Sequence, residues 1–340
     1  MKLTKFAVAL AAAVALMVVV GCSKKAAQTE SAAVVEDDAK TGAEWFEEGN
    51  NEEAGAYFEG VLQEDSTDVD ALVYMSRIAL RTDEYDAAIE WIEKALALAP
   101  DSSNVHYWAA TAYVVKVQRE NAFQLVSKVK THIDTAVELD PSNVEARMFL
   151  AGFLLNAPPM VGGSPEKASE QADIIVELDP FRGHIFWAEI HKKDKSWDEA
   201  AADYQAAAAA DPESAIPWYS LGMMYQGAEN YDGAFTAFEK ALEVDPEATN
   251  SLYQIGRTSV ISGGLNMDRS IAALKEYLGT SPPAGQPTLA NAHWRLGMLY
   301  ELKGDLDMAR AEFQAALALN PEDENARKSL ENLGTMGEGE

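Results

Sequence analysis

The amino-acid sequence predicts an all-α fold, an α-solenoid in which helical hairpins stack one on the next. One observation is the spacing of seven prolines, each of which follows an alanine-rich, helix-forming segment: Pro100, Pro141, Pro180, Pro212, Pro246, Pro282 and Pro321. Neighbouring members of this series lie 32 to 41 residues apart, and a period near 34 is typical of two-helix repeats. A second observation is that small, leucine and aromatic residues recur at helical spacing between the prolines.

The residues of a single repeat explain why it forms a hairpin. Gly222 and Ala234 are small, and we expect them to meet where the two helices approach most closely. Leu221, Tyr225 and Phe238 fall on the facing stripes of the helices and fill the remaining space. A proline ends each second helix, because it lacks an N–H group and clashes with the preceding turn. One hairpin cannot bury its own apolar face, so the repeats must stack.

The same spacing resembles the tetratricopeptide repeat. One repeat has matching residues at all eight signature positions: Trp218, Leu221, Gly222, Tyr225, Ala234, Phe238, Ala241 and Pro246. The resemblance implies a right-handed superhelix of about eight helical hairpins with a capping helix over residues 324–333. We expect the folded region at 41–334, with repeats at about 35–68, 69–102, 103–143, 144–180, 181–214, 215–248, 249–284 and 290–323.

Three repeats are longer than the others. The third has seven extra residues within 114–128, about two helical turns, which we expect to add one turn to each of its helices. The fourth has five extra residues within 156–165, and the seventh has two near Gly263 and Gly264. Insertions of this kind map to one edge of a solenoid and often take part in binding.

The N-terminal residues resemble the signal sequence of a bacterial lipoprotein. Lys2 and Lys5 precede an apolar run from Phe6 to Val20, and this run of about 15 residues is short for a membrane-spanning helix. The following Gly21-Cys22 completes a lipobox-like sequence. The resemblance implies lipidation of Cys22, a membrane partner reached through the lipid anchor, and a location in the cell envelope, at the outer membrane facing the periplasm. The expected parts are a signal peptide over 1–21, a lipidated flexible tether over 22–40 and a disordered tail over 335–340.

Charge and cysteine content exclude several classes of partner. The chain has 27 basic and 55 acidic side chains, a formal net charge of −28. Such a chain is repelled by nucleic-acid phosphates, and its net charge favours basic or neutral protein partners. Cys22 is the only cysteine, which excludes a disulfide within the chain and a thiolate metal cluster.

The histidines and the known catalytic motifs give no catalytic or metal site. His106, His184 and His293 occupy a core aromatic position of their repeats, which indicates a structural role. His184 and His191 lie about 10 Å apart along one helix, too far to share a metal, and His132 stands alone. The sequence has no G-x-S-x-G, H-E-x-x-H or C-x-x-C motif. We therefore expect no enzyme activity, no cofactor and no metal.

The function that we prefer on these grounds is a membrane-anchored scaffold that binds a protein or peptide in its concave groove. The resemblance to tetratricopeptide repeats implies that the first helix of each repeat lines that groove. The fifth and ninth residues of a repeat lie one turn apart on the same face of this helix. These positions contain aromatic, methionine and arginine side chains, which are enriched where proteins bind. The candidate groove residues are Arg77, Tyr107, Met148, Tyr219, Met223, Tyr253, Arg257, Trp294 and Met298.

An alternative function is an accessory lipoprotein that handles a small-molecule solute together with a periplasmic transport system. An extended apolar groove favours the scaffold, whereas an enclosed pocket favours the solute. For the scaffold, we expect the double substitution Tyr253→Glu and Trp294→Glu to abolish binding without disturbing the fold.

Overall fold

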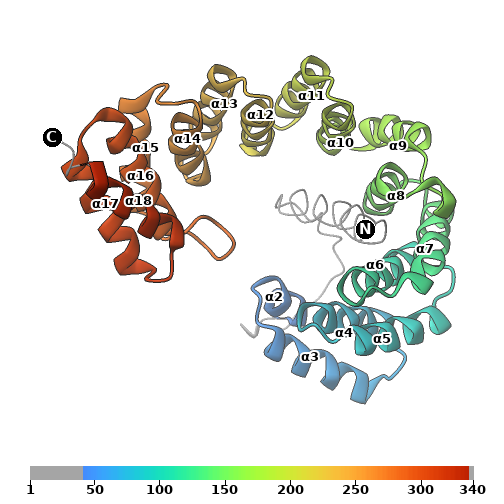
Figure 1. The fold of residues 1–340 in the computed structure, drawn as a ribbon. Helices are drawn as coiled ribbons and strands as arrows, with labels where there is room; N and C mark the ends of the chain where they lie inside the picture. Colours follow the sequence, from blue (N-terminus) through green and yellow to red (C-terminus); the bar gives the residue numbers. More distant parts are fainter. Residues whose placement is uncertain (1–40, 337–340) are drawn as a thin grey trace. The chain divides into compact units, whose positions relative to one another are not determined.

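The computed structural model describes residues 41–336, which form α-helices and two short 3₁₀ helices and contain no β-strand. The helices follow one another as hairpins along the chain (Figure 1). The prediction of an all-α solenoid of about eight hairpins is confirmed for this part of the chain. Cys22, the predicted signal peptide and the predicted tether lie outside the described residues.

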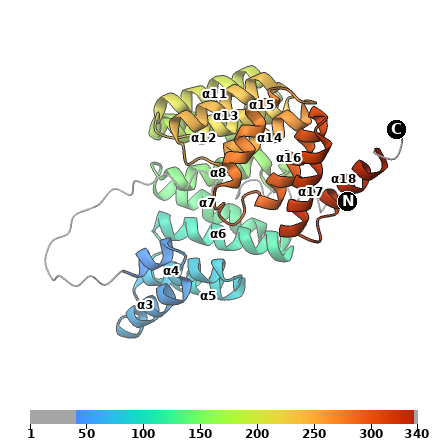
Figure 2. The same cartoon turned by 90° about the vertical axis from the view of Figure 1, so that its left-hand side faces the viewer.

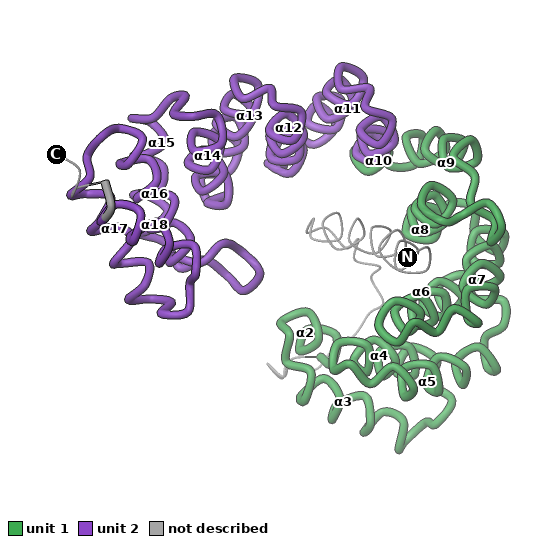
Figure 3. Tube along the Cα trace, in the orientation of Figure 1, with its two compact units in different colours: residues 1–183 green, residues 184–340 purple. Residues whose placement is uncertain are grey.

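The chain divides into two compact units, the first ending at Gly183 and the second beginning at His184 (Figure 3). The boundary falls within α10, Pro180–Lys193. Unit 1 contains α2 (Gly42–Glu47), α3 (Asn51–Glu64), α4 (Val69–Arg81), α5 (Tyr85–Leu98), α6 (Ser103–Glu120), η1 (Phe123–Leu125), α7 (Val126–Leu139), α8 (Val144–Asn156), η2 (Pro159–Val161) and α9 (Pro165–Leu178). Unit 2 contains α11 (Trp197–Ala210), α12 (Ile216–Gly227), α13 (Tyr231–Val244), α14 (Asn250–Ile261), α15 (Met267–Leu278), α16 (Leu289–Lys303), α17 (Leu306–Leu319) and α18 (Glu324–Met336).

Local sequence sets where several first helices begin. The side chains of Asp68, Ser102 and Asn143 each accept a hydrogen bond from the backbone N–H three residues ahead, which satisfies a free donor at the helix start. Thr288 does the same for α16 and forms a capping box with Asn291. The aspartate, asparagine or alanine before the repeat proline ends the preceding helix.

Close packing inside three hairpins of unit 2 depends on a glycine of the first helix. A Cβ atom added to Gly222 would lie 2.5 Å from the ring of Phe238, and one added to Gly297 would lie 2.5 Å from the ring of Phe313. The ring of Phe238 therefore occupies the space where a Cβ atom of Gly222 would lie. Gly256 faces Leu274 in the same way. The aromatic or leucine side chain fills the gap that the missing Cβ leaves.

The insertion in the third repeat differs from the expectation. The first helix, α6, has 18 residues, against 13 in α4, so it gains more than one turn. The second helix, α7, has 14 residues, the same as α5. The prediction of an extra turn on each helix is wrong for α7, because the remaining residues form an αL turn at Asn121 and the separate 3₁₀ helix η1.

The insertion in the fourth repeat forms a tight loop around η2. Gly162 has a φ of 100°, a conformation that side-chain-bearing residues avoid. A Cβ atom on Gly163 would lie 1.7 Å from the carbonyl oxygen of Ala157, so only glycine fits there. The loop leaves Met160 89% exposed. In the seventh repeat the extra residues form a turn through Gly263 and Gly264, both with positive φ.

Within each unit the helices lie in two rows, one of first helices and one of second helices (Figures 1 and 2). Several consecutive first helices touch one another, as α4 touches α6 and α14 touches α16. The second helices α3, α5, α7, α11, α13 and α15 each pack on the first helix of the next hairpin. The helix α18 closes the row of unit 2 against α17 and α16. No helix within residues 41–336 is both long enough and apolar enough to cross a membrane.

Candidate protein-interaction face

The candidate site in unit 2 lies on three successive first helices, α12, α14 and α16 (Figure 1). Six of the nine groove residues chosen from the sequence lie on these helices. We call this surface the first-helix face, defined by Tyr219 and Met223 of α12, Arg257 of α14, and Trp294, Arg295 and Met298 of α16. Arg295 was not among the sequence candidates, although it lies next to one.

A row of hydrogen bonds joins α12 to α14. The side-chain amide of Gln254 donates to the hydroxyl of Tyr219 over 3.4 Å. Arg257 donates through Nη1 to the side-chain oxygens of Gln226 and Gln254. Gln226 in turn donates to the buried hydroxyl of Thr258 over 2.8 Å. Because its partners are fixed by buried neutral groups, the Arg257 side chain is held in place on the face.

A second group of contacts joins α14, α16 and α18. Arg295 donates through Nε to the hydroxyl of Tyr253 at 3.5 Å, and its guanidinium lies 4.5 Å from the centre of the Trp294 ring. The Nη1 atom of Arg295 lies 4.0 Å from the sulfur of Met298. The indole N–H of Trp294 donates to Ser329 of the capping helix over 3.1 Å. The cation–π contact orients the guanidinium without neutralising its charge.

Exposure separates the candidates of unit 2 into two kinds. Met223 is 36% exposed, and Tyr219, Trp294 and Met298 are partly buried, so all four retain surface for a ligand. Tyr253 is only 7% exposed and belongs to the core, where its ring lies 5.6 Å from the ring of Tyr277. Tyr253 is therefore a core residue, and we now expect Tyr253→Glu to disturb the fold, because it would replace a packed ring with a largely buried carboxylate.

Burial and neighbouring groups act in opposite directions on the Tyr219 hydroxyl. Burial raises the pKa of Tyr219, while the hydrogen bond from Gln254 and the positive charge of Arg257 lower it. The net shift is upward, so this hydroxyl is neutral at physiological pH. It can donate one hydrogen bond to a ligand while it accepts the bond from Gln254.

In unit 1, the candidate Arg77 lies in an aromatic cage. Its guanidinium lies 4.4 Å from the ring of Phe46, 4.6 Å from Tyr74 and 4.5 Å from Trp108, and it pairs with Glu47 at 3.2 Å. These contacts join α2, α4 and α6. Arg77 is therefore a residue that holds the short helix α2 on unit 1, which leaves little of its charge for a ligand.

The other two candidates of unit 1 are largely enclosed. Met148 on α8 is 6% exposed. Tyr107 on α6 packs edge-on against Trp108 and Phe149, with ring centres 5.1 and 6.2 Å away. Burial raises the pKa of Tyr107. The position of a residue within its repeat predicts which side of the helix it occupies. It does not predict which neighbouring side chains enclose Tyr107 and Met148.

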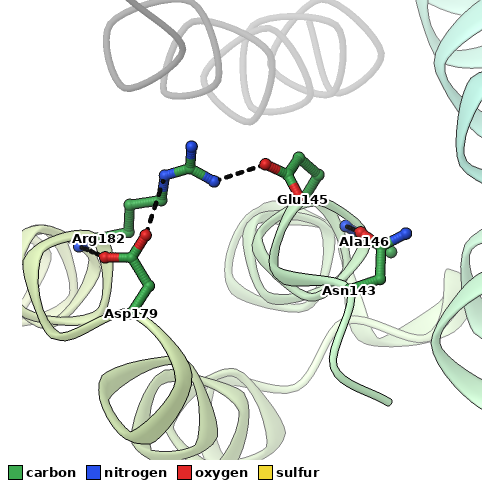
Figure 4. A network of polar contacts seen from close by, with 5 residues as sticks. All are labelled: Asn143, Glu145, Ala146, Asp179 and Arg182. Carbon is green, nitrogen blue, oxygen red and sulfur yellow. Dashed lines mark hydrogen bonds and ion pairs between the residues drawn. The ribbon is translucent and has the colours of Figure 1, made fainter. Parts of the chain in front are cut away.

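A polar network joins α8 to the start of α10 (Figure 4). Arg182 pairs with Glu145 at 2.7 Å and with Asp179 at 3.3 Å. Asp179 also accepts the backbone N–H of Arg182 over 3.0 Å, and Asn143 caps α8 through the N–H of Ala146 over 2.9 Å. Both acidic groups face one arginine, so the charge of Arg182 is already balanced within the unit.

The histidines form pairs that the sequence did not reveal. His106 and His132 face each other with their Nδ1 atoms 3.0 Å apart, so the expectation that His132 stands alone is wrong. His191 and His184 both face Asp203 of α11, at 2.7 and 3.5 Å. His293 lies 2.7 Å from Glu312. Among residues 41–336, no three His, Cys, Asp or Glu side chains gather closely enough to hold a metal ion.

Comparison with known proteins identifies the family to which these hairpins belong. Tetratricopeptide repeat models match residues 46–113, 188–256 and 290–323, which together make up about half of the chain. The chain belongs to the tetratricopeptide repeat family.

Similar proteins of known name are longer than the region they share with this chain. The peroxisomal targeting signal receptor of Candida albicans is 26% identical over 223 residues, which is 62% of this chain and 35% of the receptor. The cytochrome c-type biogenesis protein CycH of Pseudomonas aeruginosa is 28% identical over 197 residues, 53% of this chain and 46% of that protein. The chain thus spans between about a third and a half of these relatives.

Among the solved structures to which this chain is similar is TTC0263, a thermophilic tetratricopeptide repeat protein of Thermus thermophilus. It is 19% identical to this chain, and the match covers 54% of this chain and 94% of that one with a TM-score of 0.46.

Proposed function

We propose that this protein is a non-catalytic scaffold that binds a polypeptide segment of another protein on the first-helix face of unit 2. The observation that carries the proposal is the first-helix face itself. It combines Tyr219, Trp294 and two methionines with arginines that neutral groups hold in place. Aromatic, methionine and arginine side chains are enriched at the centres of protein interfaces. The repeat family and a relative named as a targeting signal receptor support a binding role.

We also propose that a lipid on Cys22 tethers the scaffold to the periplasmic side of the outer membrane. This part of the proposal rests on the lipobox-like sequence ending in Gly21-Cys22 and on the short apolar run before it. A protein with two or more acyl chains stays on a membrane stably, whereas one chain anchors it only marginally. Tethering would place the first-helix face where it meets envelope proteins at high local concentration.

Site-specific photo-crosslinking tests the binding face. A photoreactive amino acid is introduced at Met223 on α12 and, as the matched control, at Met308 on the second helix α17. The two methionines are 36% and 38% exposed, so they differ in location far more than in accessibility. We expect a discrete adduct in native membranes from position 223 and none from position 308. Adducts from position 308 alone would contradict the proposal.

A further inference from the structure

Charge is distributed unevenly between the two rows of helices in unit 2. The first helices α12, α14 and α16 carry three basic side chains, Arg257, Arg295 and Lys303, and one acidic side chain, Glu301. The second helices α11, α13, α15 and α17 carry ten acidic and four basic side chains. In a chain with twice as many acidic as basic residues, the first-helix face is therefore a locally basic surface.

The two arginines of the face also lack carboxylate partners. Within residues 41–336 neither Arg257 nor Arg295 forms an ion pair, whereas Arg269 and Arg310 of the second helices pair with Glu239 and Asp307. In the part of the chain that the structure describes, Arg257 bonds only to side-chain amides, and Arg295 contacts only a hydroxyl, a sulfur and an indole ring. Their charges are positioned but not neutralised, so a carboxylate that reaches them gains charge-assisted hydrogen bonds.

The two arginines lie on neighbouring first helices, Arg257 on α14 and Arg295 on α16. Arg295 contacts the Tyr253 hydroxyl, and Arg257 lies one turn further along α14 from Tyr253. Each arginine donates to neighbouring side chains through nitrogens that leave its Nη2 without a hydrogen bond in the described part of the chain. Met298 lies beside Arg295, and the exposed Met223 lies three residues before Gln226, the α12 residue that Arg257 contacts. The face thus offers two cationic donors set among aromatic and methionine side chains.

We infer that the first-helix face of unit 2 binds an acidic polypeptide segment, in which carboxylates alternate with apolar or aromatic side chains. This inference rests on the proposed function and specifies its partner. The carboxylates contact Arg257 and Arg295, and the apolar side chains pack on Trp294, Met223 and Met298. The net charge of the whole chain governs approach from a distance and favours basic or neutral partners, but the contact itself is decided by the charges on the face. The acidic second helices repel such a segment from the opposite side, which restricts it to this face.

Binding of defined copolymers tests the inference. The probes are a fluorescent random copolymer of glutamate and tyrosine, the corresponding copolymer of lysine and tyrosine, and a thymidine oligonucleotide. We expect the glutamate–tyrosine copolymer to bind the protein and to bind more weakly as salt is raised. The double variant Arg257→Gln, Arg295→Gln should bind it at least tenfold more weakly, because each charge-assisted contact is worth about a factor of ten. The matched variant Arg269→Gln, Arg310→Gln should bind it as wild type does.

Two controls keep the result interpretable. Arg257 contacts the buried Gln226, so the double variant could unfold. The single variant Arg295→Gln leaves that contact intact and should by itself weaken binding of the glutamate–tyrosine copolymer. The lysine–tyrosine copolymer should instead bind the acidic second helices. Neither double arginine variant should weaken its binding.

Three results would overturn the inference: no salt-sensitive binding of the glutamate–tyrosine copolymer, equal affinity of wild type and Arg295→Gln for it, or tighter binding of the oligonucleotide. The experiments distinguish failure of the acidic-segment inference from failure of the proposed function. If crosslinking from position 223 persists while the arginine substitutions have no effect, the face binds a partner but not an acidic one. If crosslinking from position 223 is absent, the proposed function itself is wrong.

Discussion

The paired imidazoles of unit 1 lead to a prediction about stability and pH. His132 is half-buried between α6 and α7, and burial, followed by the charge of His106, lowers the pKa of His132 from its ordinary 6.5 to about 4. Lys128 lowers this pKa further, and Glu93 opposes the shift. In the unfolded chain His132 is fully hydrated and binds a proton near pH 6.5. The folded protein therefore binds this proton less readily than the unfolded chain does.

The sign and size of the effect follow from this difference. Above about pH 6.5 both states hold a neutral His132, and its contribution to stability is complete. As the pH falls toward 4, only the unfolded chain gains the proton, so stability is lost in that window. A tenfold change in proton affinity corresponds to about 1.4 kcal/mol, and solvent reaches part of the ring, so we expect a loss of roughly 1–2 kcal/mol between pH 7 and pH 4.5.

Urea unfolding followed by fluorine NMR measures this loss for unit 1 alone, because 5-fluorotryptophan at Trp108 reports on α6. The general effect of acid on the many carboxylates cancels when wild type is compared with His132→Gln. We expect the wild type to lose roughly 1–2 kcal/mol more than this variant between the two pH values. His293→Gln, in unit 2, should behave as wild type at Trp108. If wild type and His132→Gln lose the same free energy, the reasoning is refuted.

Three further substitutions test the packing and the anchor. Gly222→Val would press a side chain against the Phe238 ring, and we expect it to lower the free energy of unfolding of unit 2 by roughly 1–3 kcal/mol in urea. Arg77→Leu removes the contacts that hold α2, so protease cleavage near Glu47 should accelerate while α14 and α16 keep their hydrogen-exchange protection. Cys22→Ala should release the protein from membranes into the wash fraction, and its retention in the pellet would exclude lipidation as the anchor.

The fold could be predicted from the sequence because the repeat imposes backbone constraints that single residues record. Gly222 and Gly297 stand where the facing ring of Phe238 or Phe313 leaves no room for a Cβ atom. The prolines stand where a helix has to end. These requirements are local and recur in successive repeats, so their spacing along the chain is enough to reveal the hairpins.

The details of the face could not be predicted in the same way, because they depend on what covers a residue. Tyr253 occupies a groove position, yet it is buried, since Tyr277 stands where the neighbouring repeats have Ala241 and Ala316 and its ring packs on Tyr253. His132 meets His106 because α7 packs against α6, and the sequence does not show which residues of the two helices face each other. Such pair contacts between the two helices of one repeat carry no periodic signal, so a single sequence does not display them.

The location of the binding surface is the central claim, and one measurement tests it most directly. The partner segment identified by crosslinking from position 223 is synthesised, and its affinity is measured calorimetrically for wild type, Met223→Glu and the equally exposed control Met308→Glu. We predict at least a tenfold weaker affinity for Met223→Glu, because a carboxylate is introduced into a face that binds apolar and acidic groups, and wild-type affinity for Met308→Glu. Wild-type affinity for Met223→Glu together with a loss for Met308→Glu would contradict the account and assign binding to the second helices.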